Sequence, residues 1–288
     1  MYKVVTKRFL NEAKTICLFE IEAPLAAKHA QAGQFVIFRL DEQGERVPVS
    51  IAGWDREKGT VTVMVQAAGR TTRMLHTVEQ GDYITDFVGP LGKATEMEGL
   101  KKVCVVGGGV GCAIAYPIAK EMHKLGIEVT FIAGFRSADI VILKDELKAA
   151  SDKLIICTDD GSYGEKGFTT KYLQDEIEAN IKEGKPQFDR VIAIGPDIMM
   201  KFLADVTRPY GIKTIISLDP IMVDGTGMCG GCRVIVGGET KFACVDGPDF
   251  DAHEVDFDSL LKRAAFYKEE QDEEAKHICR MTGGHRNG

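Results

Sequence analysis

The chain has 288 residues, which is long enough for two or three ordinary globular domains. Of these residues, 44% are hydrophobic and 27% are charged, which is normal for a soluble globular protein. Its formal net charge of −7 argues against a large nucleic-acid-binding surface and suits docking to a basic partner. No apolar run approaches the roughly 20 residues that cross a bilayer, and residues 1–20 are too rich in charge for a signal peptide. We therefore expect a cytoplasmic protein with neither nucleic acid nor membrane as a partner.

Residues 1–97 are predicted to form a small antiparallel β-barrel. Six short segments there are rich in Val, Ile, Phe and Thr: Lys3–Phe9, Ile16–Ile21, Gln34–Leu40, Val47–Ala52, Thr60–Gln66 and Tyr83–Val88. Turn residues such as Gly33 and Gly59 separate the segments. Helical spacing is weak, apart from a short stretch at Thr72–His76. Many short strands in so few residues are typical of a barrel.

Residues 98–217 are predicted to form an α/β domain with a parallel sheet. The expected strands are Lys102–Val106, Glu128–Ala133, Leu154–Thr158, Arg190–Ile194 and Lys213–Ser217. The expected helices between them are Ala113–Leu125, Asp145–Ala150, Thr169–Ile181 and Asp197–Thr207. Strands that alternate with helices indicate βαβ units, which place the strands side by side in one direction.

The remaining chain divides into a glycine-rich segment, residues 218–255, and a charged tail, residues 256–288. In the first of these, Arg233–Val236 and Thr240–Ala243 flank Gly237 and Gly238, which predicts a hairpin. Helical spacing of apolar residues then predicts a helix over Asp256–Met281. Thr282–Gly288 is expected to be disordered.

A glycine turn follows the first strand of the predicted parallel sheet and precedes a helix. It contains Gly107, Gly108, Gly109 and Gly111, and that context lets backbone N–H groups face a phosphate. Cys112 stands where the last glycine of the dinucleotide fingerprint would fall, so a glycine turn without a ligand is the alternative.

Two further loops of small residues follow other strands of the same sheet. Asp159–Gly164, which includes Asp160 and Gly161, comes after the third strand, and Gly195-Pro196 comes after the fourth. Open α/β sheets bind ligands at this carboxyl edge, so three such loops together favour a nucleotide cleft. Arg136, just after the second strand, could contact a 2′-phosphate, and the choice between NAD and NADP stays open.

Three clustered cysteines, Cys229, Cys232 and Cys244, predict a metal-binding site in the glycine-rich segment. Their spacing suits an iron–sulfur cluster or a zinc ion, with His253 or an aspartate as the fourth ligand. A thioredoxin-type motif would need a helix here, which Gly230 and Gly231 disfavour.

The glycine turn, Asp160-Gly161-Ser162 and the stretch Asp219–Pro248 together resemble the ferredoxin–NADP reductase superfamily. Within it, the chain is similar to electron-transfer subunits that carry a C-terminal [2Fe-2S] cluster. These include the subunits of dihydroorotate dehydrogenase and the small subunits of NADH-dependent ferredoxin:NADP oxidoreductases, which are also called sulfide dehydrogenase subunits. The resemblance covers roughly residues 1–255 and implies that the barrel binds FAD and the α/β domain binds NAD(H).

The resemblance also implies which residues bind the cofactors. Flavin contacts fall on Val47, Pro48, Val49 and Ser50, and the remaining FAD contacts fall on Met64, Val65, Gln66, Thr71 and Thr72. Relatives have a fourth cysteine five residues before the position of Cys229, where this chain has Asp224. We expect Asp224 to be the fourth cluster ligand, with Asp219 as the alternative carboxylate.

The implied function is electron transfer rather than acid–base catalysis, and no residue is assigned a catalytic role. Hydride passes between NAD(H) and FAD, and single electrons pass through the [2Fe-2S] cluster. The implied partner is a larger subunit with another flavin and more clusters, in a hetero-oligomer that bifurcates electrons and acts indirectly on ferredoxin and NADP(H). The alternatives are an electron-transfer subunit for dihydroorotate oxidation and a zinc-stabilised flavoprotein that acts as a redox sensor.

Overall fold

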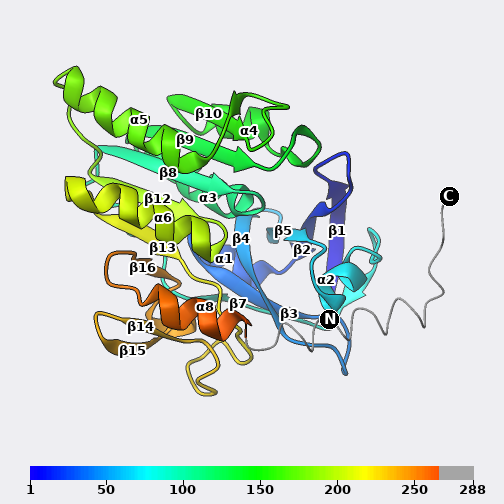
Figure 1. Cartoon of the computed structure of the whole chain (residues 1–288). Coiled ribbons are helices and arrows are strands. Elements are labelled where there is room, and N and C mark those ends of the chain that lie inside the picture. The colour runs from blue at the N-terminus through cyan, green and yellow to red at the C-terminus, as the bar shows by residue number, and fades with distance from the viewer. Residues whose placement is uncertain (266–288) are drawn as a thin grey trace.

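Two seven-stranded sheets and a small hairpin organise the chain (Figure 1). The structure, a computed structural model, describes residues 1–265. Within that part, no helix is both long and apolar enough to cross a bilayer.

The N-terminal sheet is antiparallel and has the strand order β6-β1-β2-β5-β4-β3-β7. Its strands are β1 (Tyr2–Phe9), β2 (Ile16–Glu22), β3 (Phe35–Arg39), β4 (Val47–Asp55), β5 (Thr60–Gln66), β6 (Tyr83–Ile84) and β7 (Asp86–Leu91). The two edge strands β6 and β7 are consecutive in the chain, with only Thr85 between them. The sheet therefore curves back on itself into the near-barrel that the strand pattern predicts.

Two local predictions for this sheet need correction. The segment predicted as one strand, Tyr83–Val88, is divided at Thr85, whose N–H bonds to the carbonyls of Arg39 and Leu40. In addition, a short helix, α1 (Pro24–His29), interrupts the strands, and its buried Ala26 and Ala27 join the barrel core. The predicted helical stretch is present as α2 (Arg70–Leu75).

The second sheet has the order β11-β10-β9-β8-β12-β13-β16. Its strands are β8 (Lys102–Gly108), β9 (Glu128–Phe135), β10 (Lys153–Thr158), β11 (Glu165–Lys166), β12 (Arg190–Ile194), β13 (Thr214–Ser217) and β16 (Asp249–Asp251). The first six strands are parallel: the sequence predicts five of them, and the two-residue edge strand β11 is an addition. The seventh, β16, is antiparallel and comes from the glycine-rich segment, so the sheet is mixed.

Helices cover both faces of this sheet, which explains why its central strands β8 and β12 are apolar after their first residues, Lys102 and Arg190. One face packs against α3 (Gly111–Lys124) and α4 (Lys144–Ala149). The other face packs against α5 (Thr169–Lys182), α6 (Asp197–Thr207) and α8 (Phe257–Ala265). Two 3-10 turns, η1 (Ala138–Ile140) and η2 (Arg208–Tyr210), complete the connections.

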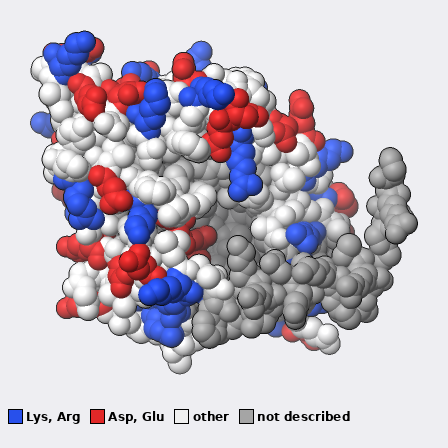
Figure 2. All heavy atoms as spheres, viewed as in Figure 1, with Lys and Arg blue, Asp and Glu red and all other residues white. Residues whose placement is uncertain are grey.

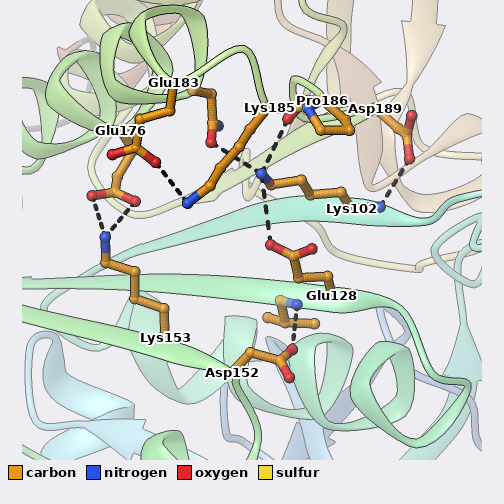
Figure 3. Close-up of polar contacts among 11 residues, drawn as sticks. Lys102, Glu128, Asp152, Lys153, Glu176, Glu183, Lys185, Pro186 and Asp189 are labelled. Atoms are coloured by element: carbon orange, nitrogen blue, oxygen red, sulfur yellow. Dashed lines mark hydrogen bonds and ion pairs between the residues drawn. The ribbon is translucent and has the colours of Figure 1, made fainter.

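Polar contacts lock the amino edge of the parallel strands (Figure 3). The Asp189 carboxylate accepts the backbone N–H groups of Lys101 and Lys102 at 2.7 and 2.9 Å, and Asp152 accepts that of Val129 at 2.8 Å. The Lys102 ammonium donates to the Pro186 carbonyl at 3.0 Å. Because these groups satisfy one another, this edge is occupied by structural contacts.

The C-terminal segment forms the predicted hairpin, β14 (Arg233–Val236) and β15 (Glu239–Phe242), followed by α7 (Ala243–Asp246), β16 and α8. The predicted helix over Asp256–Met281 is present as α8 up to Ala265. Its remainder and the predicted disordered tail lie outside the described residues. On the face shown in Figure 2, the described Lys and Arg side chains are interspersed with Asp and Glu.

A buried carboxylate joins the three parts of the chain. The Thr95 hydroxyl, in the linker between the sheets, donates to Asp249 Oδ2 of β16 at 2.6 Å. Burial raises the pKa of Asp249 to about 6. The folded protein therefore binds this proton more tightly than the unfolded chain does. As a result, the contribution of Asp249 to the free energy of unfolding falls as the pH rises from 3.8, the ordinary pKa of the group, to about 6.

We expect Thr95→Val to lower the free energy of unfolding by about 1–3 kcal/mol, because it leaves a buried carboxylate oxygen without its donor. Urea unfolding at pH 7.5, followed by circular dichroism, measures this. Thr95→Ser keeps the hydroxyl and should lose less. Thr77→Val, which removes an exposed hydroxyl bonded to the Met74 carbonyl, is the surface control. Equal stabilities of the Thr95→Val and Thr77→Val proteins would contradict the assignment.

Candidate functional site

A cavity of about 1190 Å³ opens where the barrel, the carboxyl edge of the second sheet and the C-terminal segment meet. The barrel contributes Phe35 and the β4 residues Pro48, Val49 and Ser50. The sheet edge contributes its glycine loops, and the C-terminal segment contributes Asp219, Met222 and Pro248. The cavity therefore adjoins all three parts, and it lies at the edge opposite to the one locked in Figure 3.

The structure brings the glycine loops together on the cavity: Gly108, Gly109, Gly111, Gly195 and Pro196 all line it. Packing explains part of this requirement for glycine. A Cβ on Gly111 would lie 2.3 Å from the Ile194 carbonyl oxygen, and one on Gly108 would lie 2.5 Å from the Met199 sulfur.

Gly109 differs from the other glycines of the turn. Its φ is +57°, and a Cβ there would meet nothing within 4 Å. Its N–H bonds to the Gly134 carbonyl at 2.8 Å, which fixes the turn to the end of β9. Open space beside Gly109 therefore suits the close approach of a ligand.

The predicted flavin contacts divide between the cavity and the cores. Gln66 lines the cavity with the β4 residues, whereas Val47, Met64 and Val65 do not. Val65 lies in the barrel core, and Met64 packs on the α3 side of the second sheet.

Thr71 and Thr72 also lie outside the cavity lining. The Thr72 hydroxyl oxygen accepts the N–H groups of Ala68 and Gly69 at 3.1 and 3.0 Å, so it caps α2. Thr71 donates a short hydrogen bond to Glu45 beside a second hollow of about 130 Å³.

The loop after β10 contributes Asp159 to the cavity, not the predicted Asp160 and Gly161. Asp160 instead accepts both the hydroxyl, at 2.6 Å, and the N–H, at 2.9 Å, of Ser162. These hydrogen bonds from Ser162 lower the pKa of Asp160 and fix the conformation of the turn at residues 160–162. Arg136, just after β9, lines the cavity.

Several cavity residues carry no local signal in the sequence. The aromatic side chains Phe168 and Phe202 are 65% and 54% exposed, although both line the cavity. Solvent-exposed aromatic rings at a cavity mouth suit contact with a planar ligand. Asp197 and Asp219 also line it, and the position of Asp219 on the cavity favours Asp224 over Asp219 as the proposed cluster ligand.

Two of the three clustered cysteines touch. The sulfurs of Cys232 and Cys244 lie 3.2 Å apart in a buried environment, and the Cys244 N–H points at the Cys232 sulfur. Burial raises the pKa of Cys244 to about 12. Cys229 is exposed, and its sulfur accepts the Gly231 N–H at 3.4 Å.

Asp224 lies next to this group through the backbone. Its two carboxylate oxygens accept the N–H groups of Thr226 and Cys229 at 2.8 and 2.6 Å, and the first of these bonds is the main reason that its pKa is lowered. Across residues 1–265, no three Cys, His, Asp or Glu side chains are gathered closely enough to hold a metal ion. Asp224 and Cys229 would both have to turn toward the Cys232–Cys244 pair.

The donor set nevertheless suits an iron–sulfur cluster. Two thiolates on one tetrahedral metal, each bound at about 2.3 Å, lie about 3.8 Å apart, which is close to the separation in the Cys232–Cys244 pair. Bound metal deprotonates a thiol and so removes the effect of burial on its pKa. Gly227, Gly230 and Gly231 lie within two residues of Cys229, and such a glycine-rich loop suits backbone N–H donation to the inorganic sulfides of a cluster.

The rival fourth ligand, His253, is held elsewhere. Its Nε2 lies 3.0 Å from the Thr207 hydroxyl of α6, and its backbone N–H donates to Asp251 at 3.0 Å. His253 therefore fastens β16 to α6.

Comparisons with known proteins agree with this architecture. The profile of the iron-sulfur cluster binding domain of dihydroorotate dehydrogenase B matches residues 219–256. A Thermotoga maritima homologue of the electron transfer subunit of dihydroorotate dehydrogenase B (NAD(+)) is 46% identical over 94% of each chain. A probable subunit of the same kind from Methanocaldococcus jannaschii is 34% identical over 85% of this chain and 87% of its own. One chain in the solved structure of an NADH-dependent reduced ferredoxin-NADP oxidoreductase, studied for flavin-based electron bifurcation, is 44% identical. It superposes with a TM-score of 0.87 over 96% of this chain and 98% of its own.

We expect Gly109→Ala to weaken the binding of NAD⁺ by about tenfold or more, because a methyl group would stand in the space beside the turn. Isothermal titration calorimetry measures this. Gly126→Ala is the matched control, since Gly126 also has a positive φ and open space but lies at the far end of α3. If both variants bound NAD⁺ equally well, the turn would have a purely structural role.

Proposed function

Because this chain belongs to the family of dihydroorotate dehydrogenase B electron-transfer subunits and their homologues, we propose that it exchanges hydride between NAD(H) and FAD and passes single electrons through a [2Fe-2S] cluster to a larger subunit. The observation that carries this proposal is the single cavity that adjoins the β4 residues, the glycine loops and the cysteine-bearing segment. FAD, when bound, supplies the step between two-electron and one-electron transfer.

The residues around the cavity have separate roles in this proposal. Pro48, Val49, Ser50 and Gln66 bind the flavin from the barrel side. The backbone of Gly108, Gly109 and Gly111 binds the dinucleotide phosphates, and Gly195-Pro196 borders the space for the rest of that ligand. Val47, Met64 and Val65 support the flavin strands from the cores, and Thr71 and Thr72 stay proposed contacts to the outer part of FAD.

The charges at the outer end of the cavity favour NAD(H) over NADP(H). Arg136 would attract a 2′-phosphate, but Asp159 lines the same cavity and would repel it. Asp160 and Gly161 shape the loop that carries Asp159. An acidic side chain near the ribose is the usual partner of a 2′-hydroxyl group.

The cluster site is placed to pass electrons out of the chain. Cys229 is exposed, and the neighbouring Met228, Ile221 and Val223 are exposed apolar residues. We place the catalytic partner subunit on this surface, since apolar side chains around a redox centre are typical of an interface. The proposed assembly is an electron-bifurcating NADH-dependent ferredoxin:NADP oxidoreductase with a larger flavin and iron–sulfur subunit.

A second candidate is an electron-transfer subunit for dihydroorotate oxidation. The names of the homologues and the matched cluster-binding profile favour it. Asp224, in place of the fourth cysteine that the resemblance leads one to expect, favours the first candidate. Both candidates share the same cofactors and differ in the partner subunit.

We expect the purified protein to release one FAD per chain on denaturation and to show iron–sulfur absorbance beyond the flavin bands. NADH should bleach the flavin bands faster than NADPH does. Flavin chromatography, iron and zinc analysis and stopped-flow absorbance measure these properties. Stoichiometric zinc without iron would favour the zinc-stabilised flavoprotein, and the absence of FAD from the supernatant would contradict both electron-transfer candidates.

We expect Asp224→Ala to lose or destabilise the cluster, because three cysteines supply only three of the four protein ligands that two irons need. Asp224→Cys should keep a cluster with a shifted spectrum and potential. Iron content and electron paramagnetic resonance of the reduced proteins measure this, with FAD content as the control for folding. His253→Ala is the comparison variant: a full signal in Asp224→Ala together with its loss in His253→Ala would contradict the ligand assignment.

A further inference from the structure

Two carboxylates, Asp197 and Asp219, line the cavity and have no role in the binding sites described above. Asp197 is the first residue of α6, and Asp219 comes two residues after β13. β12 and β13 are neighbouring parallel strands, with Ala193 opposite Ile216, so the chain leaves both strands at the same edge. The topology therefore brings these side chains together between the glycine loops and the start of the cysteine segment.

The pair lacks a compensating positive charge. Neither side chain forms an ion pair or a side-chain hydrogen bond within residues 1–265. Burial, and then the negative charge of Asp219, raise the pKa of Asp197 to about 6. Asp219 is exposed through the cavity, and desolvation by the protein around it raises its pKa as well.

The other charged groups nearby have partners or lie farther along the cavity. On α6 and the elements packed against it, four cationic side chains have partners of their own. Three form ion pairs: Lys201 with Asp258 of α8, Lys171 with Asp175 of α5, and Arg190 of β12 with Glu96. The fourth, Arg208 of η2, donates a hydrogen bond to the His253 carbonyl. Asp205 of α6 is exposed. Arg136 and Asp159 line the cavity from the ends of β9 and β10. None of these groups is a cause of the raised pKa values of the pair.

A structural role explains only one of the two residues. An aspartate in the first turn of a helix stabilises the helix dipole, and Asp197 fits that position. A second carboxylate beside it opposes that benefit through repulsion, and Asp219 belongs to no helix. Two like charges in one water-accessible cavity are typical of a site that binds and releases a proton.

We propose that Asp197 and Asp219 form a shared proton site for the redox reaction in this cavity. The proposal rests on the proposed function. A hydride carries one proton and two electrons. When the two electrons leave singly toward the one-electron acceptor, the bond that held the hydrogen breaks and an O–H bond forms on a carboxylate of the pair. Asp219, which is open to the cavity, then releases the proton to water, and the reverse reaction takes up a proton by the same route.

The first experiment observes the two carboxyl groups directly. The FAD-loaded protein is labelled with ¹³C at the aspartate carboxyl carbons and titrated by NMR between pH 4 and pH 8. We expect a resonance that titrates near pH 6 and disappears in Asp197→Asn. In Asp219→Asn that resonance should titrate at lower pH, because the neighbouring charge is gone. Independent titration at the ordinary value of aspartate in every protein would overturn the proposal.

The second experiment measures the proton-coupled step. After reduction by NADH, stopped-flow spectroscopy follows the loss of electrons to a one-electron acceptor, ferricyanide, as a function of pH. In the double variant Asp197→Asn, Asp219→Asn, we expect this rate to fall about tenfold or more and its inflection near pH 6 to disappear. Asp205→Asn, on the exposed face of α6, is the control and should behave as wild type.

The outcomes separate this proposal from the proposed function. Failure of NADH to reduce the wild-type protein would contradict the proposed function itself. Normal reduction, with a double variant that keeps the wild-type rate and pH profile, would overturn the proton site alone.

Discussion

The antiparallel pairing of β16 with β13 is the contact on which the arrangement of the cavity depends. Ser217 lies opposite Asp249, and Ile216 lies opposite Phe250. The Leu218 N–H also bonds to the Pro248 carbonyl at 3.0 Å. These contacts hold the beginning and the end of the cysteine-bearing segment at one point of the sheet. Asp219, Met222 and Pro248 consequently reach the same cavity as the barrel residues.

The two edges of the parallel sheet differ in the contacts that they make: the amino edge is held by structural hydrogen bonds, and the carboxyl edge faces the cavity. At the amino edge, aspartates accept the N–H groups at the starts of strands, and the Lys102 ammonium joins β8 to the loop before β12 (Figure 3). At the carboxyl edge, glycines of two loops bring the backbone to the cavity, with open space beside Gly109. Rigid contacts at one edge hold the strands that position the loops at the other, which is the usual division in open α/β sheets.

Patterns confined to a short stretch of sequence are sufficient for much of this structure. Alternating β-branched residues locate the barrel strands, and the glycine turn after β8 locates one wall of the cavity. Strand β16 has only three residues, and its pairing depends on β13, about 30 residues earlier in the chain, so no local pattern predicts it. The contact between Thr95 and Asp249 spans 154 positions and is equally invisible in the sequence. Thr72 and Asp160 show the opposite problem, because a polar residue in a loop can satisfy its own backbone instead of a ligand.

The two ends of the cysteine-bearing segment meet where β13 pairs with β16, and this affects which sequence changes the chain can accept in evolution. A segment whose two ends meet at neighbouring positions behaves as an insertion in a hairpin, and the free energy of closing a loop rises only slowly with its length. Exposed residues between Leu218 and Pro248 can therefore change while the sheet on either side keeps its register, whereas Asp219 and Met222 are constrained by the cavity that they line. In evolution, substitutions in this segment can therefore change the ligands of the iron–sulfur cluster while the rest of the fold stays the same.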